Sequence, residues 1–138
     1  MGDFWPGNIM VSLNQNGDLD RLYILDWELT KAGLPSLDIG QFCAEIHMLR
    51  RFNPEVCQET ATLVLEHFFK EYERTSERDK ELCRRAFMHM GVHMSILGGR
   101  VEWGEKELTR QVVLEGLQMV VEGYESKADD FFRMMLIA

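Results

Sequence analysis

The chain has 138 residues, and its hydrophobic content of 46% is enough for one domain with a substantial core. Its formal charge of -8, from 23 acidic and 15 basic residues, would repel a phosphate backbone and argues against nucleic-acid binding. No apolar run is long enough to span a membrane and no positively charged signal segment opens the chain, so we expect a cytoplasmic protein without membrane contact. An odd number of widely spaced cysteines is more typical of reduced thiols than of disulfides.

The first polar motif is Asp3 and Asn8, and Asp26 follows it at the end of an apolar run. Phosphoryl transfer needs a carboxylate that orients or deprotonates the attacking hydroxyl, and oxygen ligands that hold magnesium on the nucleotide phosphates. Protein kinases use the same Asp-x-x-x-x-Asn spacing and a metal-binding aspartate further along the chain. The pattern therefore predicts Asp3 as a catalytic residue and Asn8 and Asp26 as metal ligands.

Two short β-rich runs lie between these motifs, at residues 9–13 and 21–25. The Asn16-Gly17 pair between them is a strong turn signal, so the runs predict a β-hairpin. Asp26 stands at the end of the second run, where burying an unpaired carboxylate would be costly. We therefore expect a metal ion or a hydrogen-bonding partner for Asp26, with satisfaction by backbone amides as the alternative.

The remainder of the chain has helical periodicity. Ser36 is a plausible N-cap for the first helix, and Gly98-Gly99 marks the end of the third. The apolar segment at 131–137 is expected to dock on the helices. The predicted helices run from Ser36 to about Arg51, from Asn53-Pro54 to about Tyr72, from after Ser76 to Leu97, and from about Glu105 to Tyr124.

Gly2-Asp3, Asn8, Leu25-Asp26-Trp27-Glu28 and Leu37-Asp38-Ile39-Gly40 together resemble the C-terminal lobe of the aminoglycoside phosphotransferase and choline kinase-like family. Met1 stands where that family has a histidine that braces the catalytic loop. The resemblance implies an α+β, mainly α-helical fold of the protein-kinase type, with a short β-hairpin near the N-terminus followed by four to five helices. We expect one domain, with the catalytic-loop and metal-site segment at 1–40 and a helical subdomain at 41–138.

The resemblance implies a small-molecule phosphotransferase that uses ATP and Mg²⁺ to phosphorylate a hydroxyl group, with an amine such as an aminoglycoside or a choline-like compound as candidate acceptor. Asp38 would steady the loop from outside the metal site, and Glu28 is a candidate substrate-binding residue. Related kinases cover the nucleotide with an N-terminal lobe, and we expect no such lobe before Met1, although the sequence leaves open whether Met1 is a natural start. A homodimer or a partner chain is therefore expected to cover the exposed surface.

A different class of function remains open on the same residues. The chain could be a truncated derivative of the family that does not phosphorylate and instead binds a ligand or partner, or carries out other chemistry in the old substrate cleft. The three retained site residues favour the kinase, whereas the absent nucleotide-covering loop and lysine favour the derivative.

Several other side chains match the patterns of a metal site or a binding surface only weakly. Trp5 and Trp27 are expected to pack over the hairpin. The pairs His89 with His93, and Cys43 with His47, have the i, i+4 spacing of metal ligands, but core or surface positions are the better expectation for them. The methionines at 88, 90, 94, 134 and 135 are expected to fill the core rather than to form a binding surface.

Overall fold

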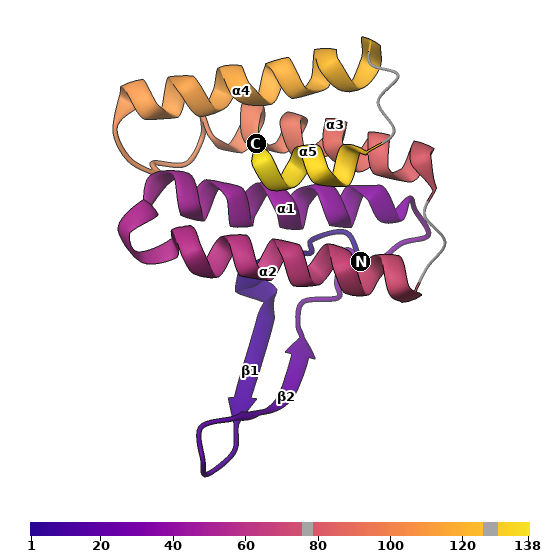
Figure 1. Ribbon diagram of the computed structural model, residues 1–138, viewed down its shortest axis with the longest axis vertical. Coiled ribbons are helices and arrows are strands. Elements are labelled where there is room, and N and C mark those ends of the chain that lie inside the picture. The colour runs from indigo at the N-terminus through magenta and orange to yellow at the C-terminus, as the bar shows by residue number, and fades with distance from the viewer. Residues whose placement is uncertain (76–78, 126–129) are drawn as a thin grey trace.

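The computed structural model describes residues 1–75, 79–125 and 130–138. Within these ranges a two-stranded hairpin near the N-terminus is followed by five α-helices, which confirms the α+β, mainly helical prediction. The helices lie together as one body and the hairpin projects away from it (Figure 1). The elements are η1 (Pro6–Asn8), β1 (Ile9–Leu13), β2 (Leu19–Ile24), α1 (Pro35–Phe52), α2 (Pro54–Thr75), α3 (Lys80–Leu97), α4 (Lys106–Glu125) and α5 (Phe131–Ile137).

The hairpin is antiparallel, and a β-bulge between Ser12 and Leu13 shifts its register. This shift pairs Leu13 with Leu19, so β2 begins two residues before the predicted start at residue 21 and ends one residue earlier, at Ile24. The turn is closed by the side chain of Asn14, whose Oδ1 accepts hydrogen bonds from the amides of Asn16 and Asp18. Asparagine is suited to this role because its side chain can imitate a backbone turn.

One face of the hairpin carries only aliphatic side chains, because residues that pair across the strands share a face. Ile9 and Ile24, at the base, are partly buried, and Ile9 packs against the core of the helices. The other four members are 51–62% exposed. We call this the aliphatic face: Ile9, Val11, Leu13, Leu19, Leu22 and Ile24.

Helix α1 begins at Pro35, and the prediction of Ser36 as its N-cap is wrong. Leu34 occupies the N-cap position without a side-chain hydrogen bond. Proline favours the first helical position because its ring fixes φ and it has no N–H to satisfy there. Ser36 is instead 2% exposed, and its hydroxyl has no hydrogen-bond partner among the described residues.

The other helix boundaries agree with the sequence to within a few residues. Helix α2 opens at Pro54 as predicted and extends three residues beyond Tyr72. The next helix was predicted to start after Ser76, which lies outside the described residues. Helix α3 begins at Lys80, where the side chain of Asp79 accepts a hydrogen bond from the Glu81 amide. This is the usual arrangement of an acidic N-cap.

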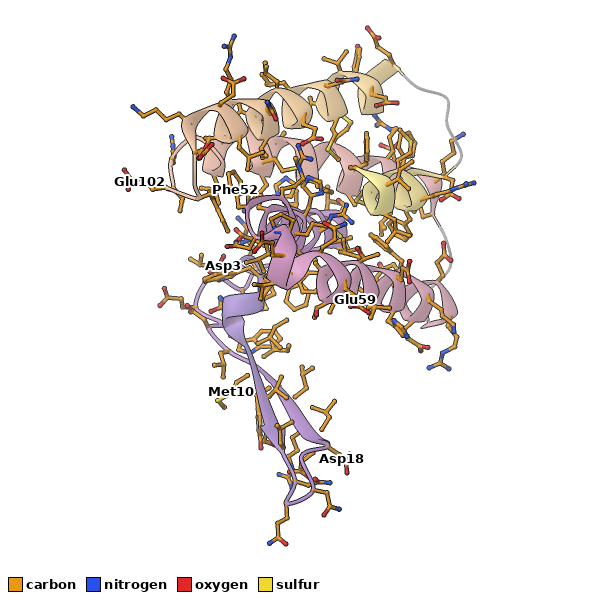
Figure 2. The ribbon with its side chains drawn as sticks, turned by 60° about the vertical axis from the view of Figure 1, so that its left-hand side comes forward. Asp3, Met10, Asp18, Phe52, Glu59 and Glu102 are labelled. Atoms are coloured by element: carbon orange, nitrogen blue, oxygen red, sulfur yellow. The ribbon has the colours of Figure 1, made fainter. Side chains whose placement is uncertain are left out.

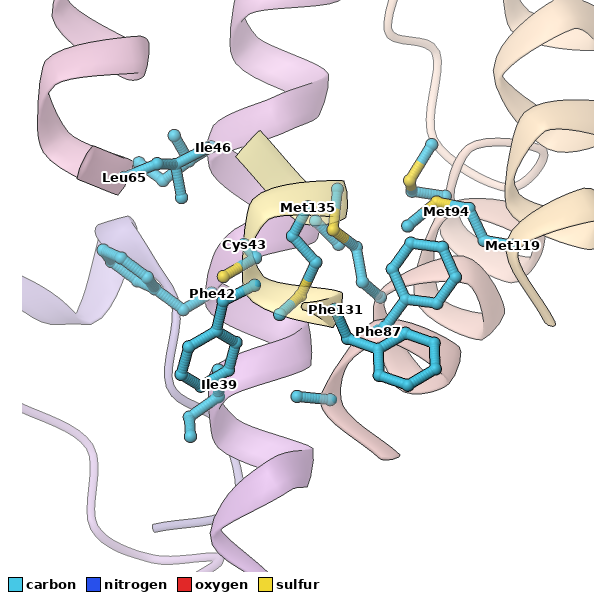
Figure 3. Packing of buried hydrophobic residues seen from close by; sticks show 14 of the residues in the cluster. Ile39, Phe42, Cys43, Ile46, Leu65, Phe87, Met94, Met119, Phe131 and Met135 are labelled. Carbon is cyan, nitrogen blue, oxygen red and sulfur yellow. The ribbon is translucent and has the colours of Figure 1, made fainter. Parts of the chain in front are cut away.

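The hydrophobic core lies between α1, α3 and α5, with contributions from α2 and α4 (Figure 3). Phe131 and Phe132 are 0% and 3% exposed, which confirms that the C-terminal segment docks on the body. The core role predicted for the methionines is confirmed for Met90, Met94 and Met135, each of which is fully buried. None of the helices in the described ranges combines the length and apolar character needed to cross a membrane.

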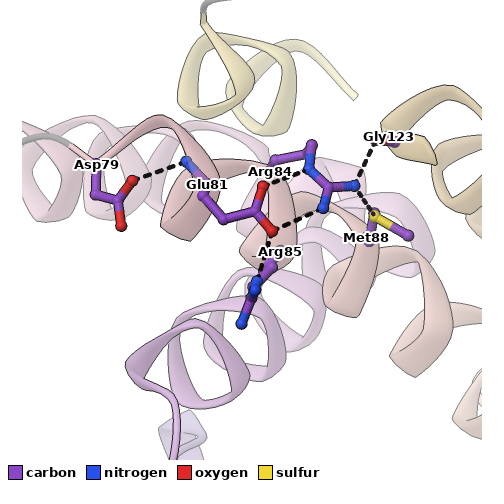
Figure 4. A network of polar contacts seen from close by, with 6 residues as sticks. All are labelled: Asp79, Glu81, Arg84, Arg85, Met88 and Gly123. Carbon is purple, nitrogen blue, oxygen red and sulfur yellow. Dashed lines mark hydrogen bonds and ion pairs between the residues drawn. The ribbon is translucent and has the colours of Figure 1, made fainter. Parts of the chain in front are cut away.

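Helices α3 and α4 approach each other at a pair of glycines. A Cβ on Gly91 would lie 2.4 Å from the carbonyl oxygen of Gly116, so no other residue fits without moving one helix. Further along, Arg84 of α3 donates a hydrogen bond to the carbonyl of Gly123 near the end of α4, and Glu81 holds both Arg84 and Arg85 (Figure 4). These contacts lower the pKa of Glu81 to about 2 through its hydrogen bonds with the two arginines.

Candidate functional site

The segment predicted to be the catalytic loop, residues 1–8, for which we keep that name, lies where the hairpin meets the helices, and the labelled Asp3 marks this junction in Figure 2. The tip of the hairpin, marked by Asp18, lies at the far end. The ring of Phe4 stacks on Phe42 of α1 with a centroid separation of 5.0 Å, which anchors the loop to the core. Residues 6–8 form η1, and the Asn8 amide donates to the carbonyl of Trp5. Phe4 thus fixes the loop on the body, and η1 directs the chain into β1.

Asp3 and Asn8 are brought into direct contact. The side-chain nitrogen of Asn8 lies 3.1 Å from Oδ2 of Asp3 and 3.0 Å from the Asp3 backbone oxygen. An amide next to a carboxylate must present its NH₂ group, since two oxygens would repel each other. The oxygen of the Asn8 side chain is therefore left available for another ligand.

The backbone links this pair to the residue that precedes Asp26. The Leu25 amide donates to the Asn8 carbonyl at 2.8 Å, which ties the residue before Asp26 to Asn8. Asp26 has φ of 58°, and among the described residues no other non-glycine residue has a positive φ. Such a conformation costs of order 1–3 kcal/mol and recurs at functional sites, where the surrounding structure holds it in place.

Asp26 is exposed, so burial does not require a partner for its carboxylate, and the metal ion expected there stays a prediction. Asp26 lies two residues beyond the end of β2, at the base of the hairpin, where Ile24 is only partly buried. No hydrogen bond or ion pair to another described residue satisfies the carboxylate. In the described ranges no three histidine, cysteine, aspartate or glutamate side chains are grouped closely enough to hold a metal ion. One carboxylate and one amide oxygen nevertheless suit Mg²⁺, which commonly takes one or two carboxylates and completes its shell with water and substrate phosphates.

Asp38 contacts the start of the catalytic loop. Its Oδ1 accepts a hydrogen bond from the Gly2 amide at 2.8 Å, and its Oδ2 lies 2.6 Å from the amino group of Met1. Gly2 has φ of +106°, and a Cβ there would lie 2.6 Å from the carbonyl oxygen of Leu29. Only glycine suits this position, and it lets the catalytic loop touch the segment that follows Asp26.

Glu28 and the two tryptophans lie on the exposed side of this region. Glu28 belongs to the turn in which the Thr30 amide donates to the Trp27 carbonyl, and it is exposed. Trp27 is 56% exposed and its indole donates to the Ile24 carbonyl, whereas the ring of Trp5 lies over Gly7. Trp27 therefore contacts the end of β2, and Trp5 contacts the turn before β1.

A small pocket of about 180 Å³ opens next to the catalytic loop. Small-molecule sites usually have roughly 300–1,000 Å³, so this pocket alone is too small to enclose a nucleotide with an acceptor. It is lined by Met1, Gly2, Lys31, Gly33, Leu34, Pro35, Leu37 and Asp38.

His89 and His93, which share a face of α3, lie next to α1. His93 is 2.7 Å from Glu45 of α1 through its Nε2. Burial lowers the pKa of His89, and the charge of His93 acts in the same direction, while Asp38 opposes both. His47 and Cys43 of α1 are both fully buried in the core. Neither pair reaches the catalytic loop through a hydrogen bond between described residues.

One polar side chain at the site was missed by the sequence analysis. Gln41 of α1 donates a hydrogen bond from Nε2 to Oδ1 of Asp3 at 2.7 Å. The sequence signal that could have indicated Gln41 is its spacing from Asp38. Residues three apart lie on the same helix face. Without the fold, nothing in the sequence related that face to Asp3.

Comparisons with known proteins support a kinase-like ancestry. Residues 1–78 match the model of the ecdysteroid kinase-like family. The chain is 28% identical over 138 residues to a 4-hydroxytryptamine kinase of Psilocybe cyanescens, covering 99% of this chain and 37% of that protein. It is 30% identical over 119 residues to a 4-hydroxytryptamine kinase of Psilocybe cubensis, covering 85% of this chain and 32% of that protein. The chain thus spans about a third of the length of these curated relatives.

These matches refine the family resemblance. They support the kinase-like part of the prediction without selecting the aminoglycoside phosphotransferase or choline kinase group. The matched residues include Asp3, Asn8, Asp26 and Asp38, because all four lie within residues 1–78. The matched region also covers more than half of the 138 residues, and the chain belongs to the ecdysteroid kinase-like family.

Proposed function

We propose that this chain is the catalytic and metal-binding part of a small-molecule kinase, which transfers the γ-phosphoryl group of ATP to a hydroxyl group. The observation that carries the proposal is the contact between Asp3 and Asn8, together with the backbone hydrogen bond that links Asn8 to Leu25, the residue before Asp26. Family membership supports the same reading. These three side chains supply the donor types that phosphoryl transfer requires.

Each residue has a defined task in this proposal. Asp3 orients the acceptor hydroxyl and receives its proton as the new bond to phosphorus forms. The side-chain oxygen of Asn8 and the carboxylate of Asp26 hold Mg²⁺, which neutralises charge on the nucleotide phosphates. Asp38 keeps the loop in place through its hydrogen bond with Gly2.

For the acceptor we propose a small hydroxylated amine. Both relatives above are named 4-hydroxytryptamine kinases, and that acceptor carries a hydroxyl group and an amine. The net charge of -8 favours a cationic molecule over an anionic one. Glu28, exposed on the turn after Asp26, is the candidate partner for the ammonium group.

We propose that the rest of the nucleotide site comes from residues outside this 138-residue sequence. The pocket beside the loop is small, and the outer part of the aliphatic face is exposed to solvent. An isolated two-stranded hairpin is marginally stable in water at best. We propose that the remaining part of a kinase of the relatives' length covers this face, and a second copy of the chain is the alternative.

Calorimetric titration with ATP in the presence and absence of Mg²⁺ tests the proposal. The natural protein that contains this chain should bind ATP in a magnesium-dependent manner, and Asp26→Ala should abolish that dependence. Asp20→Ala is the matched control, because Asp20 is exposed on the same hairpin and, among the described residues, contacts Ser12 and Arg21. Equal magnesium dependence in Asp26→Ala would refute the metal assignment.

Absence of ATP binding by the wild-type protein would favour the other function, a derivative that does not phosphorylate. The mass of the protein in solution, measured on the same sample, separates a homodimer from a monomer that needs another partner.

A further inference from the structure

The proposed function gives no task to Gln41, whose side chain contacts Asp3. It lies on α1, three residues after Asp38, and both side chains reach toward the catalytic loop from the same helix face. The hydrogen bond from Gln41 Nε2 to Asp3 Oδ1 is 2.7 Å long and partly buried. It is therefore shorter than the 3.1 Å contact that Asn8 makes with the same carboxylate.

The two amides engage opposite ends of the Asp3 carboxylate. Asn8 donates to Oδ2 from the hairpin side, and Gln41 donates to Oδ1 from the helix side. With one donor on each oxygen, rotation of the carboxylate about its last side-chain bond would break both contacts. Each oxygen still has a second lone pair, so a substrate hydroxyl can approach without displacing either amide.

The anchoring of these two amides differs. Asn8 stands at the start of the exposed hairpin, whereas α1 is packed into the core through residues such as Phe42 and Cys43, which are 5% and 0% exposed. A donor on a rigid helix fixes a catalytic group more accurately than one on a loop. We infer that Gln41 is a positioning residue, which orients the Asp3 carboxylate for the acceptor hydroxyl. This inference rests on the proposed phosphotransfer function.

A purely structural role for Gln41 is the competing explanation, since the same hydrogen bond also ties the loop to α1. Phe4 on Phe42 and Asp38 on Gly2 already supply that tie. Loss of the hydrogen bond should therefore change the orientation of Asp3 more than the position of the loop. Catalysis is sensitive to such changes, because a misplacement of about 1 Å can cost on the order of a hundredfold in rate.

Two variants of the natural protein that contains this chain distinguish these roles, with Mg²⁺-ATP and 4-hydroxytryptamine as the probes. Gln41→Ala should lower kcat by roughly 10- to 100-fold while the KM for ATP is unchanged. Gln41→Glu has the same shape but offers a carboxylate where Asp3 needs a donor. It can restore the hydrogen bond only while one proton is held between the two carboxylates. Its activity should therefore fall as pH rises, relative to the wild type.

The effect of Gln41→Glu on the pH profile of activity must be distinguished from the effects of neighbouring titratable groups. Asp38 and Glu45 lie one turn to either side of Gln41 on α1, and His89 and His93 of α3 are close to these two. All four are present in the wild type and in both variants, so the ratio of Gln41→Glu to wild type cancels their effect. Gln58→Glu, on an exposed position of α2, makes the same charge change away from the site and should follow the wild-type profile.

The outcomes separate the inference from the proposed function. An active wild type with Gln41→Ala at a kcat within about threefold of it would overturn the positioning role and leave the kinase proposal intact. A pH profile of activity for Gln41→Glu that is parallel to the wild-type profile would also overturn the positioning role. It would mean that no proton is shared between the introduced carboxylate and Asp3. A wild type that transfers no phosphate to the probe would overturn both.

Discussion

Helices α1 to α5 bury their apolar side chains against one another, whereas the hairpin β1–β2 leaves most of its aliphatic face in solvent. Phe87, Met94 and Phe131 are at most 2% exposed. Leu13, Leu19 and Leu22 of the hairpin are more than half exposed although their hydropathy is similar. The helical body therefore contains its own core, whereas the hairpin has an apolar surface that no described residue covers.

The site lies on the boundary between these two regions. Asp38 and Gln41 reach it from the packed body, and Asn8 and Asp26 reach it from the exposed hairpin segment. The groups that fix Asp3 from the body are therefore held by the core. The proposed metal ligands depend on a segment that the body holds at its base only.

The largest expected effect comes from testing the two regions with matched truncations. Phe87→Ala removes a ring that is 2% exposed and lies 5.5 Å from the ring of Phe131, and it should lower the free energy of unfolding by about 3–5 kcal/mol. Leu22→Ala, at 54% exposure on the hairpin, should change it by less than about 0.5 kcal/mol. Urea unfolding of both variants measures the difference. A cost for Leu22→Ala similar to that of Phe87→Ala would mean that the aliphatic face is covered in solution.

A smaller effect is expected at the contact between α3 and α4. Gly91→Ala places a methyl group against the Gly116 carbonyl, which is backbone and cannot turn aside. Overpacking should outweigh the better helix propensity of alanine, with a net loss of about 1–2 kcal/mol. Gly99→Ala is the control, since its nearest neighbour would be 3.8 Å away. An increase in the urea midpoint of Gly91→Ala would show that the two helices can separate freely.

The smallest effect expected is a pH dependence of the free energy of unfolding. It arises from a buried histidine in the helical body, not from the hairpin. His47 is fully buried, its Nδ1 accepts from Arg50, and its Nε2 lies 3.8 Å from Oε2 of Glu115, which also faces Arg51. Burial lowers the pKa of His47, and the Glu115 carboxylate opposes this only in part. The folded protein thus favours the neutral ring, so this stabilisation is present above the unfolded pKa of about 6.5 and is lost as pH falls below it.

The free energy of unfolding should therefore decrease between pH 7.5 and pH 5.5. His47→Gln should give a shallower slope, measured by urea unfolding at each pH. His67→Gln removes an exposed histidine of α2 and should keep the wild-type slope. An unchanged slope in His47→Gln would contradict the assignment of the buried ring as the main source.

Much of the fold could be predicted from local patterns. Asn16-Gly17 predicts the turn, and the period of apolar residues predicts the helices, because both signals act over a few neighbouring residues. The N-cap of α1 was predicted wrongly, since Pro35 and Ser36 are adjacent start signals and the burial of Ser36 depends on the packed fold. The start of β2 was missed because the bulge at Ser12 and Leu13 changes the pairing by one residue.

The candidate site also has features that the sequence could predict and features that it could not. Spacing in the sequence is enough to select Asp3, Asn8 and Asp26 as a set, because phosphoryl transfer requires these side chains and the chain keeps their order. The roles of the set, and those of Asp38 and Glu28, stay predictions. The exposure of Asp26 could not be predicted, since an apolar strand gives no indication of whether its end will be covered.

The sequence by itself determined the elements and the chemical types of the site residues, because hydrophobic periodicity, turn residues and motif spacing are local properties. The tertiary structure alone decided that Gln41 meets Asp3, that Gly91 meets Gly116, and that the aliphatic face is left open. Each of these depends on the placement of segments far apart in the chain. Packing of side chains from several elements sets that placement, and no short stretch of sequence contains it.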